Sequence, residues 1–394
     1  MKALKLKHPA QEVTGTFRLE NLGPSFFEAA PAENPLLDVF IAGIGTVGSE
    51  LLRQLEPGGP LSEDFHLIGF CNSKLALIHE EGVQQASFVN RISGQRPVTP
   101  TRWPSIVAQL IRHREKSGRG LLFVDATGSR EVALLYLRLL NAGVHVVTPS
   151  KIANTMPQHF FDQLVAPREN GALFRYEAAA GAGLPIVNTI STMVQNGDTV
   201  LRISGVLSGT MTYLFGELEK GVPFSEAVRK AYDEGYTEPD PRDDLSGEDV
   251  ARKCLILART AGIRMERDAF TAEDQTPEDL RHAPLGAFFD GLSAYDELWK
   301  KRVEEARAEG KVLRYVGTIT PEKIEVGVRA VPAESPIGTL RGADNLISIR
   351  SRYYQRSPVT IQGPGAGSEV TAQGVLADMR RIADQLSRNT ATGS

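Results

Sequence analysis

The 394-residue sequence is poor in features that mark secreted and membrane proteins. Its two cysteines, Cys71 and Cys254, cannot form a disulfide framework and fit a reducing compartment. No apolar run approaches the roughly 20 residues that a membrane-spanning helix needs. Lys2, Lys5 and Lys7 have no apolar segment behind them, so the N-terminus does not read as a secretory signal. We therefore expect a cytoplasmic protein.

The sequence also has little net charge and no obvious transition-metal motif. Its 44 basic and 48 acidic residues leave a net charge of −4, which offers no electrostatic case for nucleic acid or an anionic membrane. It contains no CxxC or HExxH spacing, and its seven histidines are scattered. Its length and a hydrophobic content of 41% predict two or three domains with an ample core.

A glycine-rich turn follows the first apolar run. Residues 36–42 read as a buried strand, GIGTVG follows directly, and apolar residues then recur at helical spacing. In such a turn the first glycine permits a tight bend, the second admits a pyrophosphate, and the third allows close helix–strand packing. A lone GxGxxG can be a chance turn, but strand–turn–helix favours dinucleotide binding. The predicted cofactor residues here are Gly43, Gly45, Thr46, Val47 and Gly48.

The second predicted strand, residues 65–71, bears on the choice of cofactor. An NAD-specific site usually places an acid at the end of this strand, to hold the ribose 2′-hydroxyl. Asn72, Ser73 and Lys74 stand there instead. No acid excludes a 2′-phosphate and Lys74 could neutralise one, so we favour NADP(H), with NAD(H) as the alternative. Lys74 could equally be an ordinary surface lysine.

Alternating strands and helices continue to residue 175. We expect a helix at 105–115, a strand ending at 125, a helix over 131–143 and a strand over 144–149. In an open parallel sheet, ligands bind beyond the carboxyl ends of the strands. The residues at that edge are Thr127, Ser129 and Lys151. Residues 35–175 therefore predict a Rossmann-type doubly wound α/β domain, with residues 1–34 as an arm or linker.

A second, α+β domain is expected over residues 176–360. A strand at 172–179 runs into small residues, where Glu177 and free carbonyls could hold a hard cation or simply form a packing turn. A strand at 201–207 leads to a helix beginning at Ser208–Thr210, and helix N-termini hold anions. Antiparallel strands are expected at 311–319, 323–331, 346–354 and 359–363. A glycine turn and a helix over 370–386 then return to the first domain, within residues 361–394.

The chain's densest group of acids lies in residues 235–253, GYTEPDPRDDLSGEDVARK. Pro239 and Pro241 predict a non-helical first half. Ser246 and Asp249 read as the capping pair of a helix that ends near Gly262. Asp249 then shares a helix face with Lys253, four residues on. The pair could be an ordinary solvated ion pair, but acids so crowded repel one another unless they bind something cationic.

These motifs together resemble homoserine dehydrogenase over about residues 37–387. The resemblance is carried by GYTEPDPRDDLSGEDVARK, VVTPSKIANT, GAGLPIV, SGVLSGTMTYLFG and GPGAGSEVTAQGVLAD. It is nearest to the dehydrogenase half of the bifunctional aspartokinase–homoserine dehydrogenases. We expect no kinase before Pro35 and no C-terminal ACT-type domain, so feedback control by threonine is not implied.

The resemblance implies reversible NAD(P)H-dependent reduction of L-aspartate 4-semialdehyde to L-homoserine, in threonine, methionine and isoleucine biosynthesis. It implies Lys253 as proton donor, Lys151 as second active-site lysine, and a homodimer formed through the second domain. The substrate residues implied are Glu238, Asp244, Asp249, Tyr236 and Thr210. Lys151, Gly235, Glu238 and Gly367 are implied at the cofactor, and Glu177, Ala180, Ala182 and Leu184 at a monovalent cation, usually sodium.

Two other functions stay open. Aspartate-semialdehyde dehydrogenase shares the substrate and cofactor but needs a thiolate nucleophile. Cys254 falls on the apolar face of its predicted helix and Cys71 at a strand end, so neither resembles an activated thiol. A catalytically inactive NADP-binding regulatory subunit is the non-enzyme alternative, and the intact set of acids and lysines argues against it.

Overall fold

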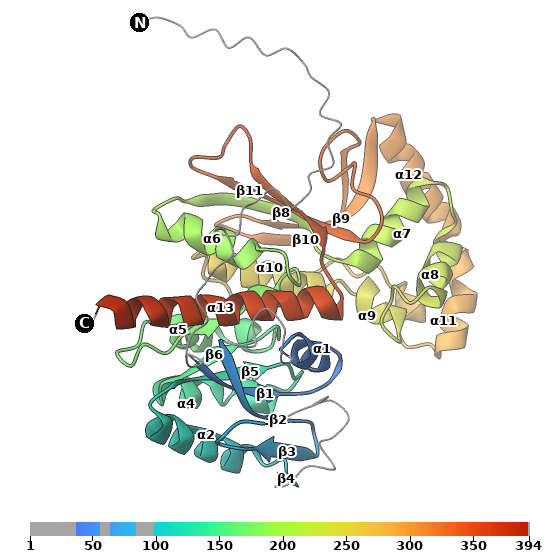
Figure 1. Ribbon diagram of the computed structural model, residues 1–394. Coiled ribbons are helices and arrows are strands. Elements are labelled where there is room, and N and C mark those ends of the chain that lie inside the picture. Colours follow the sequence, from blue (N-terminus) through green and yellow to red (C-terminus); the bar gives the residue numbers. More distant parts are fainter. Residues whose placement is uncertain (1–36, 56–63, 84–97, 393–394) are drawn as a thin grey trace, which may run out of the picture. The chain divides into compact units, whose positions relative to one another are not determined.

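The computed structural model describes residues 37–55, 64–83 and 98–392. The predicted arm, residues 1–34, lies outside this part of the chain. Two sheets organise the described residues (Figure 1), one of seven strands and one of five. No described helix has the length and apolar character needed to cross a bilayer.

The seven-stranded sheet forms the first domain. Its order is β4 (Val98–Pro100), β3 (Leu75–Ile78), β2 (Phe65–Cys71), β1 (Leu37–Ala42), β5 (Gly120–Asp125), β6 (Val144–Val147) and β7 (Phe174–Arg175). The five strands from β2 to β7 are parallel, as a doubly wound fold requires. β3 and β4 pair antiparallel at one edge. The predicted doubly wound parallel sheet is therefore confirmed, with an antiparallel edge that the sequence did not indicate.

The helices of this domain follow the sheet in sequence order: α1 (Thr46–Gln54), α2 (Trp103–Ser117), α3 (Arg130–Ala133), α4 (Tyr136–Asn141), the 3₁₀ turn η3 (Ala153–Thr155) and α5 (Gln158–Val165). The single helix predicted over 131–143 is two helices. At the break, Leu134 is half-exposed and the hydroxyl of Tyr136 donates to the buried carboxylate of Asp125. The side of α4 that carries Tyr136, Leu139 and Leu140 is buried against the sheet.

The five-stranded sheet forms the second domain, and all its strand pairs are antiparallel. Its order is β10 (Ile324–Pro332), β9 (Lys311–Ile319), β8 (Val200–Val206), β11 (Asp344–Ser351) and β12 (Val359–Pro364). All four strands predicted after residue 310 are present. β11 ends at Ser351 rather than at residue 354, and β12 runs to Pro364, past the predicted domain boundary at 360.

The helical elements of this domain were only partly predicted. They are η4 (Glu177–Ala179), α6 (Ile186–Gln195), α7 (Gly209–Glu219), α8 (Phe224–Asp233), α9 (Pro241–Leu245), α10 (Glu248–Thr260), η5 (Arg267–Ala269), η6 (Glu278–Leu280), α11 (Leu285–Gly291), η7 (Leu292–Tyr295) and α12 (Asp296–Ala308). The strand expected at 172–179 stops after two residues. The backbone turns into η4 there, and the N–H of Glu177 donates to Asp378 of the C-terminal helix at 2.7 Å.

The acidic stretch contains a short helix that the sequence reading missed. Pro241 occupies the first position of α9, where its missing N–H costs nothing, and the carboxylate of Asp240 caps the helix through the N–H of Arg242 at 3.0 Å. Ser246 does not cap α10, because Gly247 holds that position with a φ of +70°. Its hydroxyl donates to the carbonyl of Asp243 at 2.7 Å and accepts the N–H of Glu248 at 3.3 Å.

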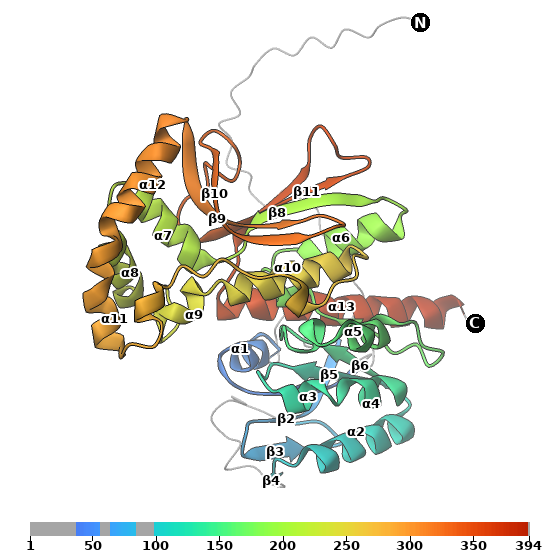
Figure 2. The ribbon, with the colours of Figure 1, turned by 180° about the vertical axis from the view of Figure 1, so that it is seen from behind.

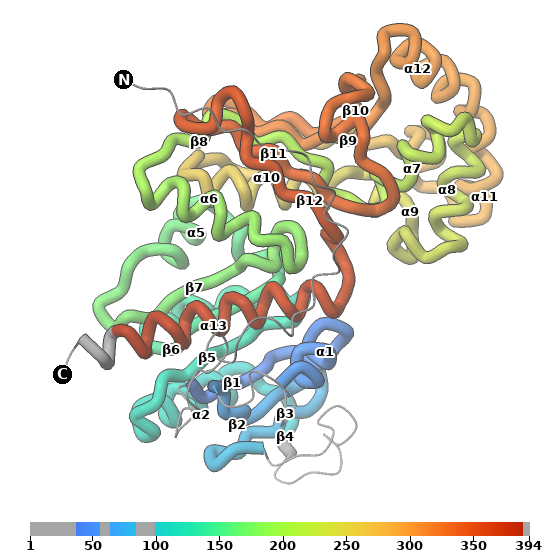
Figure 3. The backbone as a smooth tube through the Cα atoms, turned by 45° about the horizontal axis from the view of Figure 1, so that its top comes forward, coloured from blue at the N-terminus to red at the C-terminus, as the bar shows by residue number. Residues whose placement is uncertain are grey.

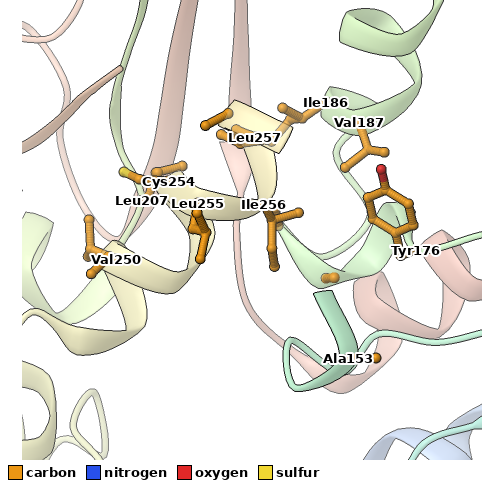
Figure 4. Packing of buried hydrophobic residues seen from close by; sticks show 14 of the residues in the cluster. Ala153, Tyr176, Ile186, Val187, Leu207, Val250, Cys254, Leu255, Ile256 and Leu257 are labelled. Atoms are coloured by element: carbon orange, nitrogen blue, oxygen red, sulfur yellow. The ribbon is translucent and has the colours of Figure 1, made fainter. Parts of the chain in front are cut away.

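Helix α10 is the buried helix of the second domain. Figure 2 shows it beneath strands β8, β9 and β10, and Figure 4 shows Val250, Cys254 and Leu257 on this helix. These three side chains and Ala258 are at most 1% exposed, which confirms the predicted apolar stripe. The helix ends at Thr260, and Gly262 follows with a φ of +82°. Glycines with positive φ flank the helix at both ends, and its apolar side is buried. The residues near its N-terminus are therefore held in fixed positions.

The last helix, α13 (Ser368–Thr392), returns to the first domain as predicted (Figure 3). Its buried face, including Val375, Leu376, Met379 and Ile382, joins Leu51 and Leu52 of α1 in one apolar cluster. It crosses the small-residue turn after η4 so closely that a Cβ on Gly374 would stand 2.6 Å from the carbonyl oxygen of Ala182. Small residues at this crossing are therefore explained by packing.

Candidate active site

A cavity of about 880 Å³ lies where the carboxyl edge of the parallel sheet meets the N-terminal half of α10. The glycine turn and the loop after β6 form one side, and the acidic loop and residues 365–367 form the other. Residues predicted for the site that line it are Val47, Thr127, Lys151, Ala182, Glu238, Asp244, Asp249, Lys253 and Gly367. The cavity is also lined by residues that were not predicted for the site, including Ser150, Asp243, Glu248, Arg252 and Gly365.

The glycine turn has the geometry expected of a dinucleotide site. Gly43 has a φ of +88°, which side chains rarely adopt, and a Cβ on Gly48 would stand 1.8 Å from the carbonyl oxygen of Gly43. Gly45 has no atom within 4 Å of where its Cβ would be, so this face of the turn is open. No side chain caps α1, which leaves its first backbone N–H groups available to an anion.

A second cavity of about 920 Å³ continues along the same edge of the sheet. It shares Ala126 and Thr127 with the first cavity, so the two are contiguous. Its wall includes Gly43, Gly45, Asn72, Ser73, Thr127 and Ser129, all predicted as cofactor residues. An extended ligand lying over the glycine turn would occupy both cavities.

The basic residue at this second cavity differs from the predicted one. Arg102 lines it together with Ser73 and Trp103, whereas Lys74 does not. The carboxamide of Asn72 accepts the backbone N–H groups of Lys74 and Leu75, each at 2.8 Å. Sequence reasoning missed Arg102 because it follows β4, an edge strand in a segment that showed no clear pattern. The only sequence signal is a basic residue just before the start of α2.

The two predicted catalytic lysines meet at one carboxylate. Asp249 Oδ2 lies 2.8 Å from Lys253 Nζ, and Asp249 Oδ1 lies 3.2 Å from Lys151 Nζ. Lys253 comes from α10 and Lys151 from the loop after β6, about 100 residues earlier in the chain. Their convergence is therefore a product of the tertiary fold.

The surroundings of Lys253 orient its ammonium group. Its side chain is only 10% exposed, and Nζ donates to the carbonyl of Leu207 at 2.8 Å in addition to Asp249. An ammonium has three N–H donors. Two are therefore engaged by the protein, and one is left for a ligand in the cavity.

Charge and burial act on this cluster in opposite directions. Burial lowers the pKa of Lys151, while Asp249 opposes that change and Lys253 adds to it. Removal from water would by itself raise the pKa of Asp249, but the ammonium groups of Lys253 and Lys151 outweigh it and hold that pKa well below its usual range. Asp249 is consequently ionised at neutral pH.

The acidic loop is held in place by Asp244. Its Oδ1 accepts the hydroxyl of Thr210 at 2.8 Å and its Oδ2 accepts the N–H of Glu238 at 2.8 Å. Burial, opposed by these two donors, raises the pKa of Asp244. The carboxylate of Glu238 lines the cavity, and within the described part of the chain it has no hydrogen bond or ion pair.

Three residues predicted for the site, Thr210, Tyr236 and Gly235, belong to or contact this loop outside the cavity wall. Thr210 also donates to the carbonyl of Tyr236 at 2.6 Å, and the ring of Tyr236 stacks on Tyr213 with centroids 4.5 Å apart. Gly235 takes a φ of +74° at the end of α8. None of the three lines the cavity in this structure. Thr46, Gly48 and Lys74 likewise lie outside the walls of the two cavities.

The predicted cation residues surround the turn that α13 crosses. The buried carboxylate of Glu177 accepts the N–H groups of Val187 and Asn188 at 2.8 and 2.9 Å. Burial, and then the nearby Asp378, raise the pKa of Glu177 to about 7. Ala182 has a φ of +53° and is the one residue other than glycine with a positive φ among those described. No group of three or more His, Cys, Asp or Glu in that part of the chain is arranged to hold a metal ion.

Neither cysteine is poised for nucleophilic catalysis. Cys71 and Cys254 are at most 1% exposed, and burial raises the pKa of each thiol to about 12. The Sγ of Cys254 points at Gly317 in the core. A thioester mechanism of the aspartate-semialdehyde dehydrogenase type therefore has no candidate nucleophile here.

Comparison with known proteins agrees with this geometry. Residues 43–177 match the family model "Homoserine dehydrogenase, NAD binding domain", and residues 185–379 match "Homoserine dehydrogenase". The chain is 34% identical over 374 residues to the homoserine dehydrogenase of Schizosaccharomyces pombe, covering 90% of this chain and 97% of that protein. It is 38% identical over 355 residues to a bifunctional aspartokinase/homoserine dehydrogenase of Haemophilus influenzae, of which it spans 43%.

A solved structure of a Candida auris protein of unknown function superposes with a TM-score of 0.80 at 34% identity, covering 88% of this chain and 98% of that one. The matches run in one order along both domains and take in the glycine turn, the lysine pair and the C-terminal glycine turn. The chain belongs to the homoserine dehydrogenase family.

Proposed function

We propose that the protein is a homoserine dehydrogenase, which reduces L-aspartate 4-semialdehyde reversibly to L-homoserine in threonine, methionine and isoleucine biosynthesis. The observation that carries the proposal is Asp249 bridging Lys253 and Lys151 on the wall of a cavity that begins at a dinucleotide-type glycine turn. When bound, the reduced nicotinamide supplies the hydride.

Lys253 is the proposed proton donor. Hydride addition leaves negative charge on the substrate oxygen, and a positioned ammonium stabilises that charge and gives up a proton. Because Leu207 and Asp249 hold two of the N–H groups of Lys253, the third can be directed at the substrate. Lys151 adds a second positive charge through the same carboxylate, and it lies on the side of the glycine turn, within reach of cofactor and substrate.

The acidic loop is the proposed site for the substrate's ammonium group. Glu238 offers an unpaired carboxylate, and Asp244 keeps the loop closed through Thr210 and the N–H of Glu238. Tyr236 and Thr210 support the loop and are proposed to act on the substrate through it. This division assigns recognition to Glu238 and proton transfer to Lys253.

NADP(H) is the proposed cofactor, with NAD(H) as the alternative. No acid directly follows β2 to repel a 2′-phosphate, and Arg102 and Ser73 line the same cavity. An arginine holds a phosphate through charge-assisted hydrogen bonds. We assign the 2′-phosphate to Arg102 and Ser73 in place of Lys74.

A monovalent cation is proposed at the turn after η4, held by Glu177 and the carbonyls of Ala180, Ala182 and Leu184. The support is chemical: these are hard oxygen donors. The positive φ of Ala182 gives this turn an unusual backbone geometry. A rise in melting temperature with sodium, larger than with choline at equal ionic strength, would support the site, and equal effects would count against it.

We further propose a cytoplasmic homodimer. The paucity of cysteine supports the compartment, and family resemblance supports the dimer. The weak net charge gives no reason to expect nucleic acid or membrane as a partner. Sedimentation velocity of the purified chain at micromolar concentration tests the dimer, which a monomeric species would contradict.

Lys253→Ala should lower homoserine-dependent reduction of NADP by about 10²–10⁴-fold, the usual contribution of a general acid–base group. NADPH affinity should change little, because Lys253 is assigned to the substrate. The measurements are steady-state turnover and fluorescence titration with NADPH. Lys300→Ala, an exposed lysine on α12, is the matched control. Equal losses of turnover and cofactor affinity would remove the proton-donor role.

Glu238→Gln should raise the KM for L-homoserine by about tenfold or more, because it removes one charged hydrogen bond to the ammonium. The KM for NADP should stay close to that of the unaltered enzyme. Glu234→Gln removes the same charge from a nearby exposed residue whose carboxylate bonds Tyr213, and serves as control. An unchanged KM for homoserine in the Glu238 variant would contradict the ammonium assignment.

Arg102→Ala should raise the KM for NADP by about tenfold while leaving that for NAD almost unchanged, because only NADP has the 2′-phosphate. Lys74→Ala should affect both cofactors equally and weakly. Parallel initial-rate series with the two cofactors provide the test. A selective loss of NADP use in the Lys74 variant, and not in the Arg102 variant, would restore the assignment to Lys74.

A further inference from the structure

Asn345 is a buried polar residue beside the active site. It stands near the start of β11 and is 1% exposed. Its Nδ2 donates to the carbonyl of Leu207 at 3.4 Å. That carbonyl is the same oxygen that accepts Lys253 Nζ at 2.8 Å. One acceptor is therefore shared by the proposed proton donor and a neutral amide from a different strand.

The other side of the Asn345 side chain rests on the C-terminal glycine turn. A Cβ on Gly365 would stand 1.8 Å from Asn345 Nδ2 and 2.1 Å from its Cγ. Gly365 itself lines the active-site cavity. The amide thus lies directly between the turn and the carbonyl that anchors Lys253, and any side chain at position 365 would displace it.

The oxygen of the Asn345 carboxamide lacks a hydrogen bond in the described part of the chain. This atom, Oδ1, is buried. A buried polar atom without a partner is destabilising, so packing alone does not account for an amide here.

Leu207 is fixed from its other side by the core. Its side chain lies near Cys254 of α10 (Figure 4), and both lie against Gly317 of β9. Two interactions therefore hold the carbonyl of Leu207 in place. The side chain of Leu207 packs in the core, and Asn345 donates a hydrogen bond to the carbonyl oxygen. Together they set the direction of the Lys253 ammonium.

We infer that Asn345 is a positioning residue for proton transfer by Lys253. By donating to the Leu207 carbonyl it fixes the oxygen that holds one N–H of Lys253, and by packing on Gly365 it ties that oxygen to the C-terminal glycine turn in the wall of the cavity. This inference rests on the proposed function. A neutral amide suits the position, because a carboxylate there would compete with Asp249 for the ammonium.

The charges around Lys253 determine how such a change would be seen. Asp249 pairs with it from α10, and the same cavity is lined by Glu248 and Arg252 of α10, by Lys151 after β6, and by Glu238, Asp243 and Asp244 of the acidic loop. In homoserine oxidation Lys253 must accept the proton of the substrate hydroxyl. A carboxylate at position 345 would draw the ammonium away from the substrate and impair this transfer.

The test compares Asn345→Ala and Asn345→Asp in homoserine oxidation. Asn345→Ala removes the amide without adding bulk, and it should lower kcat by about tenfold or more through misdirection of Lys253, with little change in the KM for NADP. Asn345→Asp keeps the size of the side chain but adds a charge, and it should lower kcat to a similar extent. Asn345→Ser, which keeps a small donor, should recover part of the lost kcat and covers the case in which a variant fails to fold.

Ser351→Ala is the matched control. Ser351 is buried in the same strand and donates to Asp198, outside the walls of both cavities. Variants of Asn345 whose kcat matches that of this control would overturn the positioning role while leaving the proposed function standing. Absence of homoserine-dependent turnover in the unaltered protein would remove the proposed function, and the positioning role with it.

Discussion

The double ion pair of Asp249 is the interaction on which the active site depends. Lys253 is largely buried and Lys151 is one-third exposed, and two ammonium groups so placed would repel each other without a shared counter-charge. Asp249 supplies that charge from one turn below Lys253 on the same helix. The cluster keeps one net positive charge, which is what a developing alkoxide requires.

The rest of the fold serves to bring these three groups together. The parallel sheet presents Lys151 at its carboxyl edge, and the antiparallel sheet holds α10 so that Asp249 and Lys253 face that edge. Helix α13 fastens the glycine turn at 365–367 to α1, which begins at the dinucleotide-type turn. Leu207, at the end of β8, orients Lys253 from the second domain. The catalytic geometry is thus shared between two domains of one chain.

Local pattern was enough to predict much of this arrangement. The glycine turn, the helix face joining Asp249 to Lys253 and the antiparallel strands after residue 310 depend on spacing that short segments determine. The start of α10 was misplaced, because serine at position 246 resembles a cap whereas a left-handed glycine holds the position. The contacts from Lys151 to Asp249 and from Asn345 to Leu207, and the shared cavity of Arg102 and Ser73, join distant segments. No single-sequence pattern encodes such proximity, so it emerged only from the fold.

The most direct test of this account is the pH dependence of homoserine oxidation in Asp249→Asn. An amide of the same shape keeps the packing and removes the charge that both lysines share. The account predicts a much lower kcat, with the acid limb of its pH profile moved down by about one unit or more, because Lys151 loses the Asp249 charge that opposes the lowering of its pKa by burial and releases its proton more readily. An acid limb unchanged from that of the unaltered enzyme would show that the carboxylate does not govern the lysines, and would contradict the account.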